Sequence, residues 1–161
     1  MVAPLDWGLG HTTRCVPVIT YLQAKGHSIL FAGNQQQCSY ISSTFRGIET
    51  IYLEGYNVRY ASSGAMFMPA IAKQVPAIMQ TIEKEHSWLQ EMANAHSIDA
   101  VISDNRYGLY HSNIPCVIMT HQLSPISGMG SMADNMVRKL HYRMLERFNR
   151  CWIVDMPQAP G

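Results

Sequence analysis

The sequence predicts an α/β fold with a doubly wound, mostly parallel, Rossmann-like sheet of about six strands and helices on both faces. Short apolar runs of strand length alternate with segments whose apolar residues recur at helical spacing. A glycine-bearing turn at 4–14 separates the first apolar run from the first helical segment. Right-handed crossovers then make the order 3-2-1-4-5-6 the simplest arrangement of the strands.

The elements follow one another without internal repeats or low-complexity tracts. After the short apolar run 1–3, apolar periodicity predicts helices over 14–25, 35–45, 65–95 and 132–150, and strands over 28–32, 48–53, 99–103, 115–119 and 152–154. Gly26 is a typical helix end, and Asn34 is placed to cap the second helix. Pro69 and Pro76 predict an interruption or kink in the third helix.

Composition sets the class of protein. One domain is expected from 161 residues, of which 47% are hydrophobic. The net charge of +1 gives no general argument for nucleic-acid binding. Cys15, Cys38, Cys116 and Cys151 lack the spacing of metal ligands, so we expect reduced core thiols. There is no signal peptide and no apolar run near the roughly 18 residues that cross a bilayer, so a cytoplasmic location is expected.

The glycine turn is the first candidate site. Gly8 and Gly10 allow a tight turn and leave no Cβ between the main chain and a ligand. The N–H groups of residues 10–13 begin a helix, where the helix dipole favours a phosphate or carboxylate. His11 stands beside these donors and is a candidate proton acceptor. The alternative is a packing turn with a solvated histidine.

Other nucleotide motifs are absent from the sequence. A dinucleotide fingerprint needs a third glycine where this chain has Thr13, and an acidic residue after the second strand, where 31–34 has none. The Gly-Lys-Ser/Thr motif of nucleoside-triphosphate loops is also missing. We therefore expect no cofactor, and the Asp, His and Cys residues show no spacing of metal ligands.

Three polar segments are predicted to converge in space. Residues 8–11 follow the first strand, 104–108 follow the fourth, and 120–122 follow the fifth. In a sheet of order 3-2-1-4-5-6 the chain reverses between strands 1 and 4, and ligands bind beyond the carboxyl ends of the strands at that reversal.

Two further segments are candidate contact surfaces. The polar and aromatic loop 54–64 contains Tyr56, Arg59 and Tyr60 as ligand contacts, with surface disorder as the alternative. In helix 132–150 the periodicity places one set inward: Met136, Val137, Leu140, Met144, Leu145 and Phe148. The opposite face carries Arg138, Lys139, Arg143, Arg147 and Arg150. Such a face either rests on the anionic surface of the inner membrane or is simply solvated.

Residues 6–11 (DWGLGH), 104–108 (DNRYG) and 120–123 (THQL) together resemble the amino-terminal half of bacterial glycosyltransferases of the GT-B fold. The chain is most similar to the group related to the peptidoglycan and lipopolysaccharide N-acetylglucosaminyltransferases, which use UDP-N-acetylglucosamine. The resemblance covers the whole chain but half of such an enzyme. It implies that 1–156 form the acceptor domain, that 157–161 begin an interdomain linker, and that a donor-binding domain lies outside this chain.

The resemblance also implies an inverting transfer of N-acetylglucosamine from a UDP-sugar to a cell-envelope or lipid-linked glycan. His11 would take the proton of the acceptor hydroxyl, and Asp104 would orient or polarise the imidazole. Without a donor domain the chain is expected to be inactive. The residues expected to contact substrate are Asp6, Gly8, Gly10, Thr12, Asn105, Arg106, Tyr107, Thr120, His121 and Gln122.

Several roles stay open at this point. Peptidoglycan transferases carry a glycine-richer run where this chain has Asp6 and Trp7, so Asp6 is a second candidate for the base. Asp104 could instead cap a turn. Arg106 either binds a phosphate or pairs with an acid, and His121 either lines the site or lies in the core. The alternative functions are half of a UDP-sugar epimerase and a non-catalytic carbohydrate- or anion-binding module.

Overall fold

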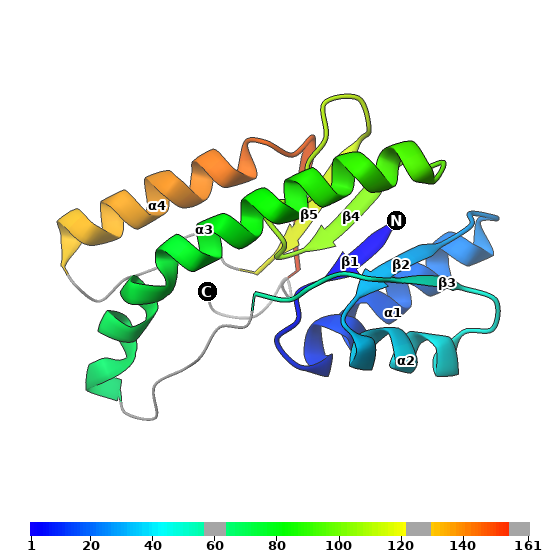
Figure 1. Ribbon diagram of the computed structural model, residues 1–161, viewed down its shortest axis with the longest axis horizontal. Helices are drawn as coiled ribbons and strands as arrows, with labels where there is room; N and C mark the ends of the chain where they lie inside the picture. The colour runs from blue at the N-terminus through cyan, green and yellow to red at the C-terminus, as the bar shows by residue number, and fades with distance from the viewer. Residues whose placement is uncertain (57–63, 122–129, 155–161) are drawn as a thin grey trace.

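The computed structural model describes residues 1–56, 64–121 and 130–154, and for 64–73 the backbone alone. Six parallel strands form one sheet in the order β3-β2-β1-β4-β5-β6, which confirms the predicted fold class (Figure 1). The strands are β1 (Val2–Pro4), β2 (Leu30–Gly33), β3 (Glu49–Tyr52), β4 (Val101–Asp104), β5 (Cys116–Thr120) and β6 (Arg150–Ile153). The helices are α1 (Leu9–Ala24), α2 (Gln35–Thr44), α3 (Gly64–Ala95) and α4 (Ser131–Leu145).

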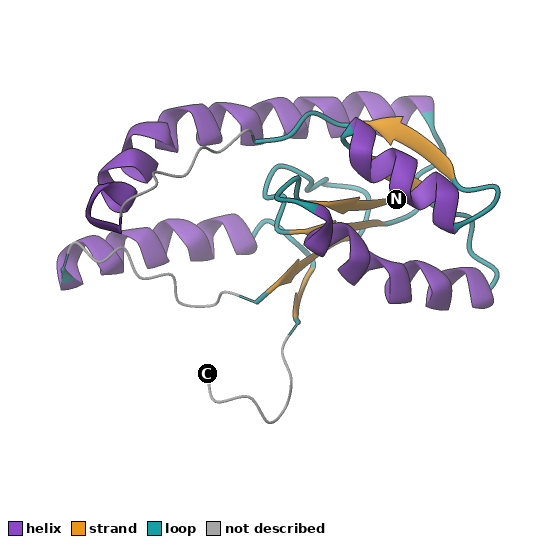
Figure 2. Ribbon diagram, turned by 90° about the horizontal axis from the view of Figure 1, so that it is seen from below, coloured by secondary structure: helices purple, strands orange, loops and turns teal. Residues whose placement is uncertain are grey.

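Two apolar layers flank the sheet, because neighbouring residues of a strand point to opposite faces. Val2 and Phe31 belong to one cluster, which packs against α1 and α2. Ala3 and Ala32 belong to the other cluster, which also contains Leu89 of α3. Figure 2 shows the strands between the two sets of helices. The domain is therefore a three-layer α/β structure.

Helix α1 begins at Leu9, five residues before the predicted start. Its first turn carries few apolar residues, so the apolar period on which the prediction rested becomes visible only further along the helix. Gly8, at φ 70° and ψ −175°, lets the chain turn into the helix. The predicted cap of α2 is confirmed: Asn34 Oδ1 accepts from the Gln37 N–H, and Gln37 Oε1 accepts from the Asn34 N–H.

Helix α3 is one continuous element, and its ribbon bends in the amino-terminal part (Figure 1). The helix runs through Pro69 and Pro76 without ending, so the predicted interruption does not occur, while the alternative prediction of a kink agrees with the bend. Proline removes one hydrogen bond and bends a long helix without necessarily stopping it. On the buried side of α3 lie Ile82, Glu85 and Leu89.

Helix α4 corrects the sequence prediction most strongly. Met136 is 73% exposed and Leu140 is 41% exposed, although both were expected to face inward. The buried residue of α4 is His141, and Phe148 is buried beyond the end of the helix. Figures 1 and 2 show the reason: the amino-terminal part of α4 extends past the strands, so no sheet lies beneath it.

The four cysteines are free. Cys15, Cys38 and Cys116 are buried as expected, but Cys151 is exposed on β6, so its assignment to the core is wrong. Strand β6 is an edge strand with all four residues exposed. Within the described residues, no helix combines the length and the apolar character needed to cross a membrane.

Candidate functional site

The glycine turn and the segment after β4 lie side by side at the carboxyl edge of the sheet. Strands β1 and β4 are neighbours, and their register sets Pro4 opposite Asp104. The Leu5 N–H then donates to the Asp104 carbonyl oxygen at 2.9 Å, which extends the pairing into the loop before α1. The topology thus brings two distant polar segments to the point where the direction of winding reverses.

His11 and Asp104 form a close pair. His11 Nδ1 lies 2.8 Å from Asp104 Oδ2, and the side chain of Asp104 is fully buried while that of His11 is 12% exposed. A carboxylate can only accept, so the ring donates its Nδ1–H in this contact. The lone pair of the neutral imidazole is then on Nε2. Paired in this way, His11 has the tautomer that a general base needs.

The second oxygen of Asp104 is also engaged. Arg14 Nη1 lies 3.5 Å from Asp104 Oδ1, and Asn105 Nδ2 donates to the same oxygen at 3.3 Å. A buried carboxylate needs such partners, because removal from water disfavours its charge. His11 and Arg14 are three residues apart on α1, so one helical turn supplies two of the contacts. The carboxylate is held at both oxygens.

Asn105 has a left-handed backbone with φ 56°, which is uncommon for a residue other than glycine. Its N–H donates to the Met119 carbonyl oxygen of β5 at 3.0 Å. The turn after β4 is thereby tied to the neighbouring strand. This conformation sets the direction in which the chain leaves Asp104, and asparagine is among the residues that tolerate it best.

Tyr107 joins the segments after β4 and β5. Its side chain is hydrogen-bonded to Thr120, which is fully buried. Burial raises the pKa of Tyr107 to about 12, with the nearby Cys151 and Asp104 adding to the rise. The ring of His141 from α4 meets the Tyr107 ring edge to face, with centroids 5.7 Å apart. Tyr107 and Thr120 therefore lie near the His11–Asp104 pair, and their side chains are hydrogen-bonded to each other.

Arg106 pairs with an acid, which is one of the two roles predicted for it. Its side chain is fully buried, and its Nε lies 2.6 Å from Glu85 Oε1. Its other nitrogens donate to the carbonyl oxygens of Pro4, at 3.2 Å, and Glu54. The guanidinium thus joins α3 to the end of β1 and to the chain after β3, and it has no exposure to solvent.

Tyr56 completes the cluster around Glu85. Its hydroxyl donates to Glu85 Oε2 at 2.6 Å, and that same hydroxyl accepts from the Tyr107 N–H at 3.2 Å. Burial raises the pKa of the Glu85 carboxyl, an effect that the Arg106 cation and the Tyr56 hydroxyl partly offset. Burial, and then the charge of Glu85, raise the pKa of Tyr56. This network links α3 to the segments that follow β3 and β4.

The other residues predicted in the glycine turn have distinct surroundings. Asp6 Oδ1 accepts from the Tyr56 N–H at 3.0 Å, so Asp6 fixes the start of the loop after β3. Gly8 and Gly10 are exposed, and a Cβ at either would meet nothing within 4 Å. Thr12 is fully buried, and its hydroxyl has no hydrogen-bond partner among the described residues.

Of the four remaining predicted contacts, the structure describes one. His121 is exposed, which excludes its alternative as a core residue. Arg59, Tyr60 and Gln122 lie outside the described residues.

Sequence reasoning missed Arg14 and Glu85, and each had a pattern that could have found it. Arg14 follows His11 by three residues, the spacing of side chains on one helix face. Glu85 lies between Ile82 and Leu89 at positions that share the apolar face of α3, where a lone carboxylate needs a buried partner.

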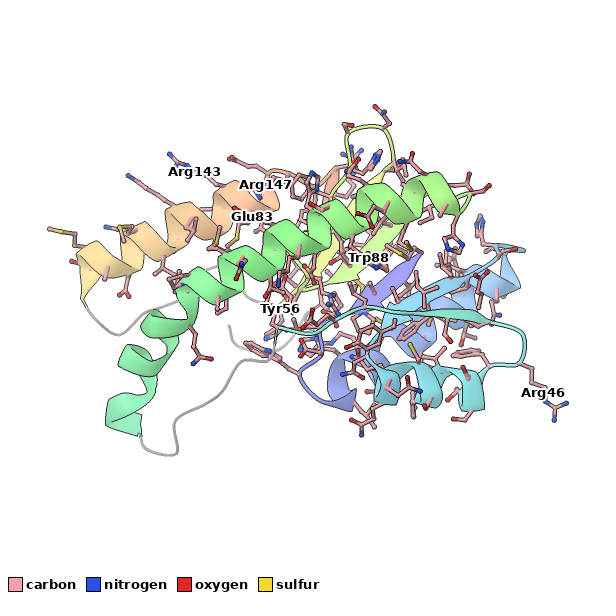
Figure 3. All side chains as sticks on the ribbon, in the orientation of Figure 1. Arg46, Tyr56, Glu83, Trp88, Arg143 and Arg147 are labelled. Atoms are coloured by element: carbon pink, nitrogen blue, oxygen red, sulfur yellow. The ribbon has the colours of Figure 1, made fainter. Side chains whose placement is uncertain are left out.

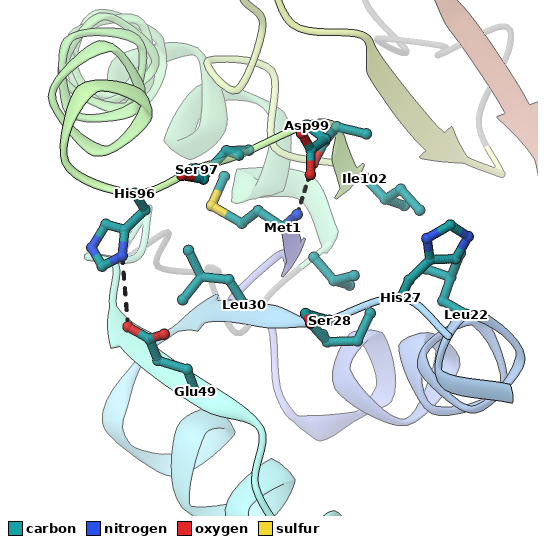
Figure 4. A pocket seen from close by; sticks show the side chains of 14 residues that line it. Met1, Leu22, His27, Ser28, Leu30, Glu49, His96, Ser97, Asp99 and Ile102 are labelled. Atoms are coloured by element: carbon teal, nitrogen blue, oxygen red, sulfur yellow. Dashed lines mark hydrogen bonds and ion pairs between the residues drawn. The ribbon is translucent and has the colours of Figure 1, made fainter. Parts of the chain in front are cut away.

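A large cavity lies at the opposite edge of the sheet. It has a volume of about 420 Å³ and is lined at the amino ends of the strands by residues such as Met1, Leu30 and Glu49 (Figure 4). His96 Nδ1 lies 3.6 Å from Glu49 Oε1 there. None of the predicted site residues lines this cavity. The His11–Asp104 pair and the cavity thus lie at opposite edges of the sheet. We place the candidate site at the His11–Asp104 pair.

Comparison with known proteins finds structural similarity but no family. No protein-family model matches the sequence, and no curated protein matches it. Among solved structures, the chain is similar to part of CalG4, the calicheamicin glycosyltransferase. The match has a TM-score of 0.46 and 14% sequence identity, and covers 87% of this chain and 36% of that chain. The chain thus spans about a third of the protein it matches.

Proposed function

We propose that this chain is the acceptor-binding domain of an inverting glycosyltransferase in which His11 is the general base. The observation that carries the proposal is the contact between His11 Nδ1 and the buried carboxylate of Asp104. This contact turns Nε2 into the proton acceptor and supports the charge that develops on the ring. In the reaction, Nε2 takes the hydroxyl proton as the acceptor oxygen attacks the anomeric carbon and the nucleoside diphosphate leaves.

The finer assignments belong to the same proposal. The donor is UDP-N-acetylglucosamine, the acceptor is a cell-envelope or lipid-linked glycan, and a donor-binding domain completes the enzyme. They rest on the resemblance of the three sequence segments, and the start of α1 beside His11 adds main-chain N–H groups that suit an anionic group of a substrate. Gly8, Gly10, Asn105 and His121 are proposed to contact the acceptor. This domain alone binds acceptor without transferring sugar.

The test uses the enzyme that carries both domains. His11→Gln and Asp104→Asn are assayed for UDP release from UDP-N-acetylglucosamine in the presence of an envelope glycolipid extract. We expect each variant to lose about 10²- to 10⁴-fold in rate, because the base is removed or its tautomer is no longer fixed. His27→Gln, which changes an exposed histidine elsewhere, is the matched control. Full turnover of His11→Gln would remove His11 as the base and leave Asp6 to be tested.

A second measurement needs only this chain. Nitrogen-15 shifts of the His11 ring should show a protonated Nδ1 in the neutral imidazole, and the Asp104→Asn variant should lose this preference.

The alternative functions predict other results. A pure binding module would keep its affinity for glycan in His11→Gln and in Asp104→Asn, because main-chain amides would do the binding. An epimerase would interconvert UDP-hexosamines without any acceptor.

A further inference from the structure

Trp7 is an exposed aromatic residue in the middle of the glycine turn. It is 44% exposed, although tryptophan is a residue type that is highly buried on average. The other two tryptophans lie elsewhere: Trp88 packs against an apolar cluster from α3 (Figure 3), and Trp152 lies on the edge strand β6. Trp7 is thus the tryptophan that stands beside the candidate site.

The main chain around Trp7 is fixed in place. The Gly8 N–H donates to the Asp6 carbonyl oxygen at 2.9 Å, which closes a three-residue turn with Trp7 at its centre. Asp6 is held in turn, because its Oδ1 accepts from the Tyr56 N–H at 3.0 Å and the Tyr56 hydroxyl donates to Glu85. An aromatic ring on a fixed backbone offers a binding surface at a low cost in conformational entropy.

The turn leaves room next to this ring. A Cβ added at Gly8 or at Gly10 would meet no atom within 4 Å, so no neighbouring side chain fills the space over the main chain there. His11 follows Trp7 by four residues, which limits the separation of their Cα atoms to about 14 Å. A ligand of modest size can therefore lie on Trp7 and reach His11.

The surroundings of Trp7 select the chemistry of that ligand. The face of an indole suits C–H groups. The carboxylate of Asp6 directly precedes the ring, which disfavours a phosphate there and favours hydroxyl donors. An acyl chain needs a continuous apolar surface, but the residues on either side of Trp7 are Asp6 and Gly8. A pyranose ring combines a face of C–H groups with a rim of hydroxyls, so it fits both features.

We propose that a pyranose ring of the acceptor stacks on Trp7. The part of the acceptor held at the glycine turn is then a sugar, and its lipid or diphosphate lies elsewhere. This inference rests on the proposed function and adds to it a binding residue and the class of the bound group. The stacked ring orients the acceptor so that its hydroxyl reaches His11 Nε2.

The first test uses this chain with N,N′-diacetylchitobiose as the probe. The three tryptophans give three indole N–H signals in a nitrogen-15 spectrum, which substitution by phenylalanine assigns. We expect the disaccharide to shift the Trp7 signal, and the protons of one sugar face to move upfield because they lie over an aromatic ring. Trp7→Ala should weaken binding about tenfold, and Trp7→Phe should weaken it less.

The matched control is Trp152→Ala, which removes a tryptophan of nearly equal exposure, 45%, from β6. It should bind like the unaltered chain, and circular dichroism should show each variant folded. A Trp7 signal that the disaccharide leaves unchanged, or full binding by Trp7→Ala, would overturn the proposal. So would a shift of this signal by hexanol or pyrophosphate but not by the disaccharide, since the ring would then hold lipid or diphosphate.

The enzyme that carries both domains separates this inference from the proposed function. With the envelope glycolipid extract as acceptor, Trp7→Ala should raise the acceptor KM about tenfold and lower kcat far less, because stacking binds the acceptor equally before and during transfer. A loss of kcat at unchanged KM in Trp7→Ala would overturn the stacking role and leave His11 as the base. Full turnover of His11→Gln would overturn the base and leave sugar binding at Trp7 intact.

Discussion

Two buried carboxylates, Asp104 and Glu85, lie close to the carboxyl end of β4, and their partners differ in exposure to solvent. The side chain of Asp104 is fully buried, but that of its partner His11 is 12% exposed. Glu85 is 2% exposed, and its partner Arg106 has no exposed surface and uses three of its nitrogens on protein oxygens. The difference separates the two pairs: the His11–Asp104 pair, which reaches solvent through His11, is the one that we propose for catalysis, and the fully enclosed Glu85–Arg106 pair is the one that we expect to stabilise the fold.

The largest effect should come from breaking the buried pair. Arg106→Met should lower the free energy of unfolding by about 3–5 kcal/mol, because it leaves Glu85 buried without its cation. Arg14→Met should cost under about 1 kcal/mol, since the side chain of Arg14 is 32% exposed and Asp104 retains His11. Urea denaturation followed by circular dichroism measures both. Equal losses in the two variants would contradict the distinction between the pairs.

A smaller effect should come from the turn that follows Asp104. Asn105→Ala should lower the free energy of unfolding by about 1–2 kcal/mol, because alanine resists the left-handed backbone at φ 56°. Asn105→Gly should lower the free energy of unfolding by less, because glycine accepts this backbone conformation. Both variants lose the hydrogen bond from the Asn105 side-chain amide to Asp104. The same denaturation experiment applies. Should glycine prove as costly as alanine, the amide contact and not the backbone would be what holds Asp104.

Alkaline pH should weaken the fold through Tyr107. The pKa of Tyr107 is about 12 in the folded chain, against an ordinary value of 10. Between these values the unfolded chain releases a proton that the folded chain keeps, so the free energy of unfolding falls as the pH rises from 10 to 12. Tyr107→Phe should show a shallower fall in denaturation measured across this range. Tyr21→Phe, which changes a 63% exposed ring, should follow the unaltered protein.

The smallest effect should come from the outer face of α4, which belongs to neither carboxylate pair. Met132→Gln with Met136→Gln should change the free energy of unfolding by no more than about 0.5 kcal/mol, because both side chains are mostly exposed. Thermal unfolding measures this baseline. A loss of several kcal/mol would mean that these methionines are packed against the domain.

The order of the sheet and the meeting of residues 8–11 with 104–108 were predictable from sequence, because parallel strands place their carboxyl ends together. The partner of Arg106 was not predictable, since Glu85 lies on α3 and only the packed structure brings the two together. The inward face of α4 was mispredicted for a related reason. Periodicity reveals that a helix has two faces, but which face is covered depends on what lies beneath it.

Helix ends were predicted less well where a helix begins with polar residues. The first two turns of α1 contain the polar run 11–14 (HTTR), and a method that searches for apolar periodicity does not detect such residues as helical. The polar residues that include the proposed base, His11, are thus the reason why the start of α1 was predicted too late.

Gln37 gives the glycine turn a distant reporter. Its side-chain amide donates to the Leu5 carbonyl oxygen at 2.8 Å, while its Oε1 accepts from the Asn34 N–H. A molecule that lifts the turn away from β1 must stretch the first contact and loosen the second. Hydrogen–deuterium exchange at the Asn34 amide, directly after β2, would then report binding at the glycine turn without any label placed there.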